Sequence, residues 1–372
     1  MDDATTIPPL KNTFFIFAGE KSGDAQGAKL LLYLQKLPLN FIGVGGPAMR
    51  KAGLSCILNM EEFQVMGFLA ILKGLPKIIK QFFFLKRQIL KINPAIVLFI
   101  DYPGLSLALS KSLRKSGYQG KIVQFVCPSI WAYKKNRKQK LIQYYDLILT
   151  LFEFEQKLFD GSPLKAVWAG HPLADLPNSP PKENPILAIF PGSRRSEITL
   201  NLPFQLKAAR EIKRLYGYEI FISCASLDLL PLIQQYNLDS YQVLSDAHHL
   251  MDKATVACAT SGTVTLELAL KKIPTVVTYG IKPFDEWLAR NIFKIDLPFY
   301  CIVNIILEKM TFKELIGAIF TDQALLKALE NIITNQEEMT RVQSECIHFK
   351  EKIYLPSQET VILDSIKSLL CL

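Results

Sequence analysis

The segment at residues 260–267, Thr-Ser-Gly-Thr-Val-Thr-Leu-Glu, carries side chains suited to binding an anion. A turn of small residues that enters a helix leaves backbone N–H groups free beside the positive end of the helix dipole. Gly262 lets a phosphate approach the backbone closely, and the hydroxyls of Ser261 and Thr263 can add hydrogen bonds. Glu267 lies one helical turn beyond Thr263, where a carboxylate suits the two hydroxyls of a ribose. An ordinary helix start capped by Ser or Thr is the alternative interpretation, and for this segment alone it is the commoner one.

Carboxylates also follow two apolar runs in the first half of the chain. Glu20, Ser22 and Asp24 lie in the loop Gly-Glu-Lys-Ser-Gly-Asp. Asp101 directly follows the apolar run at 95–100. If these runs are parallel strands, their carboxyl ends face the crevice in which such sheets bind ligands. A carboxylate presented there can act as a general base that takes the proton from an attacking hydroxyl. Capping of the next helix or turn is an equally good interpretation of Ser22, Asp24 and Asp101.

The elements that must position these residues alternate along the chain. Short apolar runs, separated by stretches with helical periodicity, lie at 13–18, 41–44, 95–100, 122–126, 147–151, 186–190, 219–224, 255–259 and 275–279. This alternation predicts parallel sheets with helices on both faces. A segment with four prolines at 175–185 separates two such series. The sequence therefore predicts an α/β protein with two doubly wound, Rossmann-like domains, residues 1–175 and 176–344, that face a central ligand-binding cleft.

Composition limits the classes of protein. The 372 residues are 49% hydrophobic and 21% charged, which is typical of a globular chain long enough for two domains. No apolar run approaches the roughly 18 residues that cross a bilayer, and the acidic start does not resemble a signal peptide, so a cytoplasmic protein is expected. The seven cysteines form no CxxC pair, so neither a disulfide framework nor a zinc site is expected. A net charge of +9 favours nucleic acid, an anionic membrane surface or a phosphorylated substrate as partner.

Two segments combine basic and apolar side chains. Residues 68–87 mix bulky apolar residues with lysines and contain no acidic residue. That pattern suits a helix lying in a membrane interface, although a buried amphipathic helix is its commoner meaning. Residues 131–140 combine aromatic and basic residues and could contact nucleic acid, an anionic lipid headgroup or only solvent. We expect no binding of nucleic acid.

Taken in order, these segments resemble the lipid-A-disaccharide synthase family. The matching stretches are Ala-Gly-Glu-Lys-Ser-Gly-Asp at 18–24, Gly-Val-Gly-Gly-Pro-Ala-Met at 43–49, Val-Met-Gly at 65–67, Pro-Ser-Ile-Trp-Ala at 128–132, Phe-Glu-Phe-Glu at 152–155, Gly-His at 170–171, Ala-Asp at 174–175, Pro-Gly-Ser-Arg at 191–194, Glu197, Ser-Gly-Thr at 261–263, Glu267, Lys-Pro-Phe at 282–284 and Asn304. Each stretch alone is a weak signal, whereas the ordered set, which spans roughly residues 13 to 316, is specific.

The resemblance implies a fold similar to that of two-domain GT-B glycosyltransferases, and it implies an activity. The family joins UDP-2,3-diacylglucosamine to 2,3-diacylglucosamine 1-phosphate through a β-1,6 linkage, with inversion and loss of UDP. No cofactor is implied. The family resembles peripheral membrane enzymes, so the implied location is the cytoplasm, at the inner face of the inner membrane. Its members can form homodimers that exchange C-terminal segments, and by analogy a C-terminal helix at about 345–372 packs back on the first domain.

The resemblance also assigns catalytic residues. Asp101 matches the aspartate proposed as general base, Arg194 an arginine near the UDP, and Asn304 an active-site asparagine. His171 is the alternative base, because histidine is the commonest acid–base residue, although a structural histidine is equally good there. The sequence has no Asp-x-Asp motif, so we expect the leaving UDP to be stabilised without a metal, by Arg194 and a helix dipole. In that mechanism the acceptor 6-hydroxyl loses its proton to Asp101 and attacks the anomeric carbon.

The same resemblance assigns the residues that bind the nucleotide sugar. They are Ser261, Gly262, Thr263, Glu267, Ser193, Glu20 and Ser22. The sequence departs from the family pattern around the acceptor, with Gly104, Leu105 and Ser106 after Asp101, Val303 before Asn304, and Gly317 in place of a glutamine. A changed acyl-chain preference, a different acceptor or reduced activity would each be compatible with these departures. The remaining alternatives are another UDP-sugar enzyme of this fold, such as an N-acetylglucosaminyltransferase or a 2-epimerase, and a weakly active, membrane-associated protein that binds nucleotide sugars.

Overall fold

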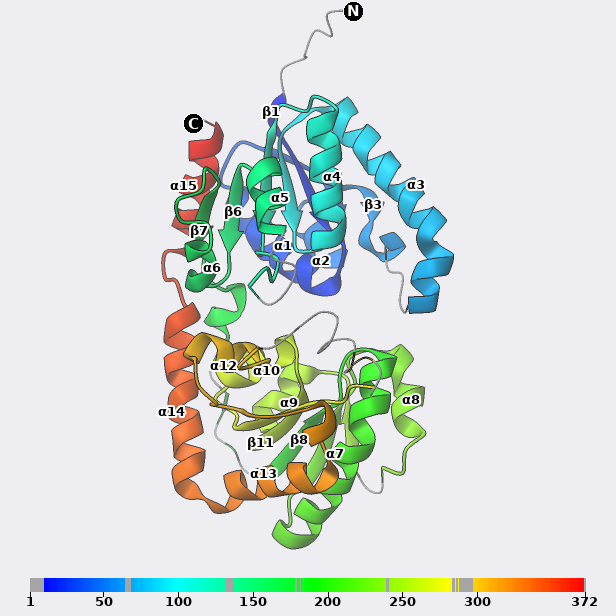
Figure 1. The fold of residues 1–372 in the computed structure, drawn as a ribbon, viewed down its shortest axis with the longest axis vertical. Helices are drawn as coiled ribbons and strands as arrows, with labels where there is room; N and C mark the ends of the chain where they lie inside the picture. The colour runs from blue at the N-terminus through cyan, green and yellow to red at the C-terminus, as the bar shows by residue number, and fades with distance from the viewer. Residues whose placement is uncertain are drawn as a thin grey trace, which may run out of the picture. The chain divides into compact units, whose positions relative to one another are not determined.

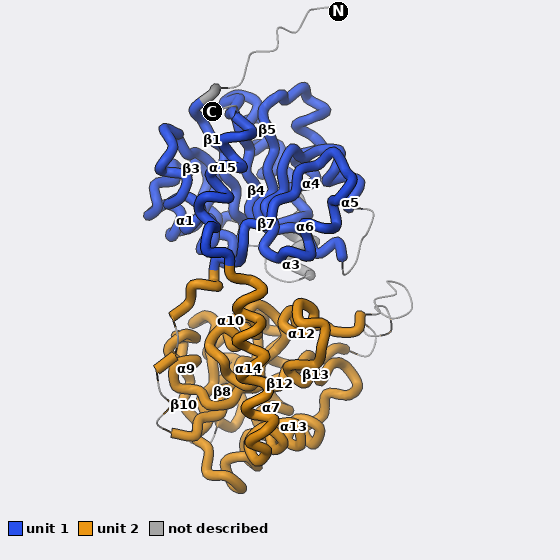
Figure 2. Tube along the Cα trace, turned by 90° about the vertical axis from the view of Figure 1, so that its left-hand side faces the viewer, with its two compact units in different colours: residues 1–172, 355–372 blue, residues 173–354 orange. Residues whose placement is uncertain are grey.

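The computed structural model describes most of the chain and divides it into two compact units. The described residues are 10–63, 68–131, 137–177, 179–180, 182, 184–238, 241–282, 285, 287 and 297–370, without the side chains of 10, 11, 63 and 68–76. Unit 1 comprises Met1–Pro172 and Leu355–Leu372, and unit 2 comprises Leu173–Tyr354 (Figure 2). The first division falls three residues before the expected boundary at 175.

Unit 1 is built on a parallel sheet with helices on both faces (Figure 1). Its elements are β1 (Leu10–Ala18), α1 (Lys21–Leu34), β2 (Asn40–Gly45), α2 (Pro47–Lys51), β3 (Ser55–Asn59), η1 (Met60–Phe63), α3 (Phe68–Ile92), β4 (Pro94–Ile100), α4 (Pro103–Lys115), β5 (Lys121–Phe125), α5 (Arg137–Tyr144), β6 (Leu147–Thr150), α6 (Glu153–Lys157), β7 (Lys165–Trp168) and α15 (Gln358–Leu370). The strand order is β3-β2-β1-β4-β5-β6-β7.

Alternate residues of β1 explain how this sheet is buried on both faces. Phe14 and Ile16 belong to a core formed with α1 and α15, whereas Phe15 and Phe17 belong to a core formed with α3, α4 and α5. Successive side chains of a strand point to opposite faces, so a strand covered on both sides must be apolar throughout. That requirement is the reason why the strands of this sheet are recognisable in the sequence as continuous apolar runs.

Unit 2 repeats the plan with a second parallel sheet. Its elements are η2 (Pro172–Asp175), which begins at the last residue of the first segment of unit 1, β8 (Ile186–Phe190), α7 (Arg195–Tyr216), β9 (Glu219–Ser223), η3 (Leu227–Leu229), α8 (Leu230–Gln234), β10 (Gln242–Leu244), α9 (Ala247–Lys253), β11 (Val256–Thr260), α10 (Thr263–Leu270), β12 (Thr275–Tyr279), α12 (Ile302–Leu307), β13 (Lys313–Ile316), η4 (Gly317–Ile319), α13 (Asp322–Thr334) and α14 (Gln336–Ile353). The strand order is β10-β9-β8-β11-β12-β13. One core packs under α7 and α13 and another under α9 and α10.

The C-terminal part of the chain returns to unit 1 at Leu355, later than the expected start near 345. Residues 345–353 continue α14, whose buried positions Val342, Cys346, Phe349 and Ile353 follow one helical stripe within unit 2. The chain leaves this stripe only after Ile353. Helix α15 then adds buried isoleucines to the core of unit 1.

Candidate nucleotide and acceptor sites

The strand order of unit 2 brings together two loops that are far apart in the sequence. Strands β8 and β11 are paired, and the chain winds outward from them in opposite directions, toward β9 and β10 on one side and β12 and β13 on the other. In open parallel sheets, ligands bind beyond the carboxyl ends of the strands at such a reversal of strand order. Residues 191–194 follow β8, and residues 261–263 follow β11. The predicted nucleotide-binding residues of unit 2 therefore lie at neighbouring strand ends.

Helix α10 begins without a side-chain cap. Gly262 is its N-cap residue and has an extended backbone, with φ 164° and ψ −164°. The nearby hydroxyl of Thr265 donates a hydrogen bond to the carbonyl oxygen of Gly262 at 2.7 Å, so it does not cap the N–H groups of the helix. A Cβ at Gly262 would meet no atom within 4 Å, and Gly262 and Thr263 are both exposed, so the first residues of the helix are accessible. An uncapped and accessible N-terminus is the arrangement that an anion requires.

Glu267 has a partner that the sequence did not indicate. Its carboxylate lies 3.9 Å from Nε2 of His248, which stands in α9. Burial raises the pKa of Glu267, and the nearby His248 opposes that rise. The pairing joins two helices that are separated by a strand, so nothing in the sequence indicates it.

The loop at 191–194 is folded by Glu197. The Glu197 carboxylate accepts hydrogen bonds from the backbone N–H groups of Ser193 at 2.9 Å and Arg194 at 3.2 Å. Its other oxygen pairs with the Arg194 guanidinium at 2.8 Å, while 72% of the Arg194 side chain stays exposed. The arginine is thus tethered at the strand end and still accessible, which suits a group that meets a negatively charged ligand.

Unit 1 places its candidate residues at the equivalent reversal of strand order. There β1 and β4 are paired, with β2 and β3 on one side and β5, β6 and β7 on the other. Glu20 and Ser22 follow β1, and both are exposed. Asp101 follows β4 and is half-buried. Burial and the nearby charge of Glu20 raise the pKa of Asp101, and a hydrogen bond from the backbone N–H of Tyr102 opposes the rise.

Tyr102 joins the two loops of unit 1. A Cβ at Gly19 would come within 2.9 Å of the Tyr102 ring, so the ring lies directly on the backbone of the loop after β1. The ring also contacts Phe17, with centroids 5.8 Å apart. Glycine at position 19 therefore lets the loop of Glu20 approach the loop of Asp101 closely.

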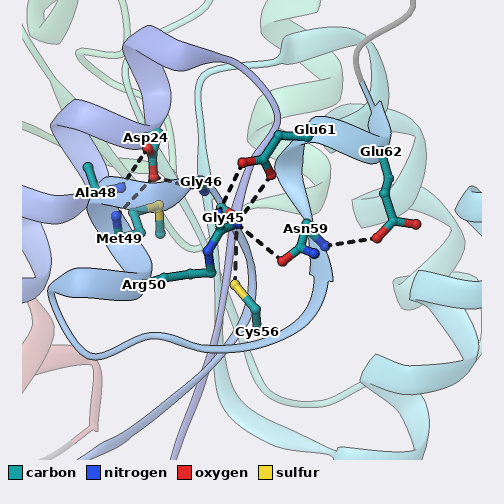
Figure 3. A network of polar contacts seen from close by, with 10 residues as sticks. All are labelled: Asp24, Gly45, Gly46, Ala48, Met49, Arg50, Cys56, Asn59, Glu61 and Glu62. Carbon is teal, nitrogen blue, oxygen red and sulfur yellow. Dashed lines mark hydrogen bonds and ion pairs between the residues drawn. The ribbon is translucent and has the colours of Figure 1, made fainter.

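Asp24 caps a helix, although not its own. Its carboxylate accepts hydrogen bonds from the backbone N–H groups of Gly46, Ala48 and Met49 at 2.8, 3.0 and 3.0 Å, so it caps α2 (Figure 3). Arg50 of the same helix forms an ion pair with Glu61. The network shown in Figure 3 thus holds the turn after β2 in place. These contacts give Asp24 a structural role as the cap of α2.

Asn304 is fully buried in unit 2 and its amide is used within the protein. Its Nδ2 donates to the carbonyl oxygen of Phe312 at 2.7 Å and to Glu314 at 2.8 Å. Its Oδ1 accepts from the backbone N–H groups of Thr311 and Phe312, both at 2.9 Å. This network joins α12 to the strand β13, and the expected active-site role of Asn304 stays a prediction.

His171 lies in a cluster of aromatic rings. Its ring stacks on Phe152 with centroids 5.6 Å apart, and Phe152 stacks on Phe154, which contacts Trp131. Burial and the charge of Lys29 lower the pKa of His171 to about 4, so the imidazole is neutral at pH 7 but weakly basic. These features favour a structural histidine, and Asp101 is the better candidate for the base.

Some predicted segments lie outside the described residues. They are the stretch at 65–67, the centre of the basic segment at 132–136, residues 283–284 of the Lys-Pro-Phe stretch, and the side chains at 68–76 in the membrane-facing candidate.

Two parallel-sheet units, each with its candidate residues at a reversal of strand order, define the fold class of the GT-B enzymes. The crystal structure of UDP-GlcNAc 2-epimerase from Neisseria meningitidis bound to UDP-GlcNAc is similar, with a TM-score of 0.64, 11% identity, and coverage of 96% of this chain and 100% of that chain. A sequence model of the lipid-A-disaccharide synthetase family matches residues 14–361, and the chain belongs to this family.

Named relatives agree with the family assignment. The lipid-A-disaccharide synthase of Coxiella burnetii is 33% identical over 91% of this chain and 93% of its own length. The enzyme of the same name from Chlamydia trachomatis serovar D is 40% identical over 91% of this chain. The chain spans only 59% of the length of that chlamydial relative.

Proposed function

We propose that the chain is an inverting glycosyltransferase of lipid A synthesis, which joins UDP-2,3-diacylglucosamine to 2,3-diacylglucosamine 1-phosphate and releases UDP. Family membership supports this reaction. The observation that carries it is the placement of each set of candidate residues at a reversal of strand order in its own unit. Unit 2 would hold the nucleotide diphosphate, and unit 1 would hold the acceptor.

In the proposed reaction, the acceptor 6-hydroxyl oxygen attacks the anomeric carbon of the donor sugar. The bond from that carbon to the UDP oxygen breaks, and the proton of the hydroxyl passes to the Asp101 carboxylate. A base with a raised pKa is better matched to proton transfer near neutral pH, and both burial and Glu20 raise the pKa of Asp101. The helix start at Gly262 and the Arg194 guanidinium would stabilise the charge that develops on UDP.

The position of Glu267 in α10 supports the assignment of the nucleotide to unit 2. Glu267 is half-buried, so its carboxylate can accept hydrogen bonds from ribose hydroxyls with little competition from water. His248 would then lie beside the ribose. The similar epimerase structure was solved with UDP-GlcNAc bound, which agrees with nucleotide-sugar binding by this fold.

The assay that tests the proposed function offers the purified protein two sets of substrates. With both lipid substrates present, we expect equimolar UDP and disaccharide 1-phosphate, measured by chromatography and mass spectrometry. With UDP-GlcNAc alone, we expect no epimerised sugar. Epimerisation without disaccharide, or transfer to a water-soluble acceptor only, would contradict the proposal and favour another UDP-sugar enzyme of the same fold.

We further propose that α3 contacts an anionic membrane. Among its described side chains, Leu85 and Ile89 are buried in the core, while Ile79, Phe83 and Phe84 are exposed by 48%, 61% and 37%. The exposed basic residues Lys77, Lys80 and Arg87 lie beside them on the helix. Apolar side chains bordered by basic ones suit an interfacial helix. No helix in the described parts of the chain is both long and apolar enough to cross a membrane.

Vesicle binding tests the role of α3. Replacing Ile79, Phe83 and Phe84 by serine should weaken binding to anionic vesicles by at least about tenfold, because each buried apolar side chain contributes about 1.5–3 kcal/mol. Leu227→Ser, at a position of unit 2 that is 73% exposed, is the matched control and should bind as the unaltered protein does. Equal binding by all three proteins in a flotation assay would reject this surface. Light scattering of the same proteins without vesicles tests whether the chain forms the homodimer that the family resemblance allows.

A further inference from the structure

Gln124 is an unexpected residue for its position. It lies in β5, near the middle of the sheet of unit 1, and is fully buried. Strands covered by helices on both faces are normally apolar, and burying an amide is costly unless its hydrogen bonds are made. The amide nitrogen of Gln124 finds partners among its neighbours, whereas its buried Oε1 has no hydrogen-bond partner in the part of the chain that the structure describes.

The amide nitrogen of Gln124 donates to three backbone carbonyls at one edge of the sheet. The acceptors are the carbonyl oxygens of Asp101 at 3.1 Å, Phe125 at 3.3 Å and Val126 at 3.2 Å. Since all three partners are acceptors, the nitrogen end of the amide must face them. The backbone N–H of Asp101 in turn donates to the carbonyl oxygen of Phe125 at 2.9 Å. One side chain thus ties the end of β4 to the end of β5.

The backbone that Gln124 holds is strained. Asp101, Tyr102 and Val126 have φ angles of 52°, 58° and 73°, in the left-handed region that residues other than glycine rarely adopt. Val126 is β-branched, which makes this conformation especially unfavourable. Such conformations persist only where the surroundings enforce them, and they cluster at functional sites.

We propose that Gln124 is a positioning residue that holds the left-handed turn at Asp101 and so fixes the direction in which the Asp101 carboxylate leaves the end of β4. This inference rests on the proposed function, in which Asp101 is the base. Gln124 itself would touch no substrate. It would act through its hydrogen bonds to two backbone carbonyls, that of Asp101 just after β4 and that of Val126 just after β5.

The test compares Gln124→Met with Tyr118→Phe. Methionine keeps the length of glutamine and removes the N–H donor, and Gln124→Leu serves as a second variant if the first folds poorly. The Tyr118 hydroxyl donates to the carbonyl oxygen of Pro94 at 2.7 Å, at the opposite end of β4. Tyr118→Phe therefore removes a buried side-chain hydrogen bond to β4 without touching Asp101, and it controls for loss of stability.

Kinetics and carboxyl titration give the decisive readouts. Gln124→Met should lower kcat by about 30-fold or more with KM for the UDP-sugar within about twofold, and the same change in an Asp101→Asn background should have no further effect. The NMR-measured pKa of the Asp101 carboxyl should shift by at least about half a unit in Gln124→Met and stay unchanged in Tyr118→Phe.

Two results would overturn the inference. One is a loss of kcat in Gln124→Met no greater than that in Tyr118→Phe, and the other is an unchanged Asp101 pKa. If the unaltered protein makes no disaccharide, the proposed function fails, and the carboxyl titration still decides whether Gln124 positions Asp101.

Discussion

Asp101 combines three features that each lower the stability of a folded protein. Its backbone is left-handed, its carboxyl group is half-buried, and the charge of Glu20 lies close to it. Its folded-state pKa is therefore raised above the ordinary value of about 3.9. Ionised Asp101 thus destabilises the folded protein, and this cost develops as the pH rises from about 3.9 through the raised pKa.

Asp101→Asn should stabilise the protein while removing the proposed activity. At pH 7 we expect a Tm higher by about 2 °C or more, because the amide carries no charge to desolvate. The difference should vanish at about pH 3, where the aspartate is protonated as well. Scanning calorimetry at both pH values measures this. A variant with a lower Tm than the unaltered protein at pH 7 would show instead that the ionised Asp101 carboxylate stabilises the folded protein.

At the element scale, α6 buries a second unusual carboxyl group. Burial raises the pKa of Glu155 to about 8, and the backbone N–H of Phe152 donates to it at 3.3 Å. His171, stacked on Phe152, has the opposite tendency, with a pKa lowered to about 4. Between their ordinary values near 4.3 and 6.5, the two titrations change stability in opposite directions. Above pH 6.5, only the titration of Glu155 still changes the free energy of unfolding with pH.

The free energy of unfolding should therefore fall between pH 6.5 and pH 8, since a raised carboxyl pKa costs stability until the folded-state pKa is passed. Glu155→Gln should flatten this fall, and His171→Gln should leave it in place. Urea unfolding at pH 6.5, 7.2 and 8 measures the slope. Equal slopes in the unaltered protein and in Glu155→Gln would mean that Glu155 is ionised in the folded state.

Much of the element arrangement could be predicted from the sequence, because strands buried on both faces must be continuous apolar runs. The loops at 191–194 and 261–263 and the position of Asp101 follow from the ends of those runs. The pairing of His248 with Glu267 could not be predicted, because it depends on how two helices lie over the sheet. The left-handed backbone at Val126 could not be predicted either, since a β-branched residue gives no signal for it.

At the scale of the whole molecule, the chain ends by completing the unit in which it begins. Ile362 and Ile366 of α15 belong to the same core as Leu30 and Leu34 of α1. Gln358 donates to the carbonyl oxygens of Ala169 and Gly170 at 2.8 and 3.0 Å, shortly before the chain enters unit 2 at Leu173. Unit 1 therefore becomes complete only after unit 2 has been synthesised.

Ile366→Ala should destabilise unit 1 selectively. The fully buried side chain leaves a cavity, which costs about 2–5 kcal/mol. Hydrogen exchange measured by mass spectrometry should show faster exchange in peptides from β1 and unchanged exchange in peptides from β8. Ser368→Ala, at an exposed position of the same helix, should change neither. Equal loss of protection in β1 and β8 would show that the two units unfold together.

In the proposed function, the reversal of strand order in unit 2 binds UDP, and the reversal in unit 1 activates the acceptor. The most direct test measures UDP affinity by calorimetry and disaccharide formation in the same two variants. Asp101→Asn should keep the Kd for UDP within about twofold and lose at least about 100-fold in kcat, as expected for a general base. Glu267→Gln should weaken UDP binding about tenfold, as expected for the loss of a hydrogen bond to a charged group. Unchanged UDP affinity in Glu267→Gln, together with weakened affinity in Asp101→Asn, would contradict the assignment of UDP to unit 2 and of the base to unit 1.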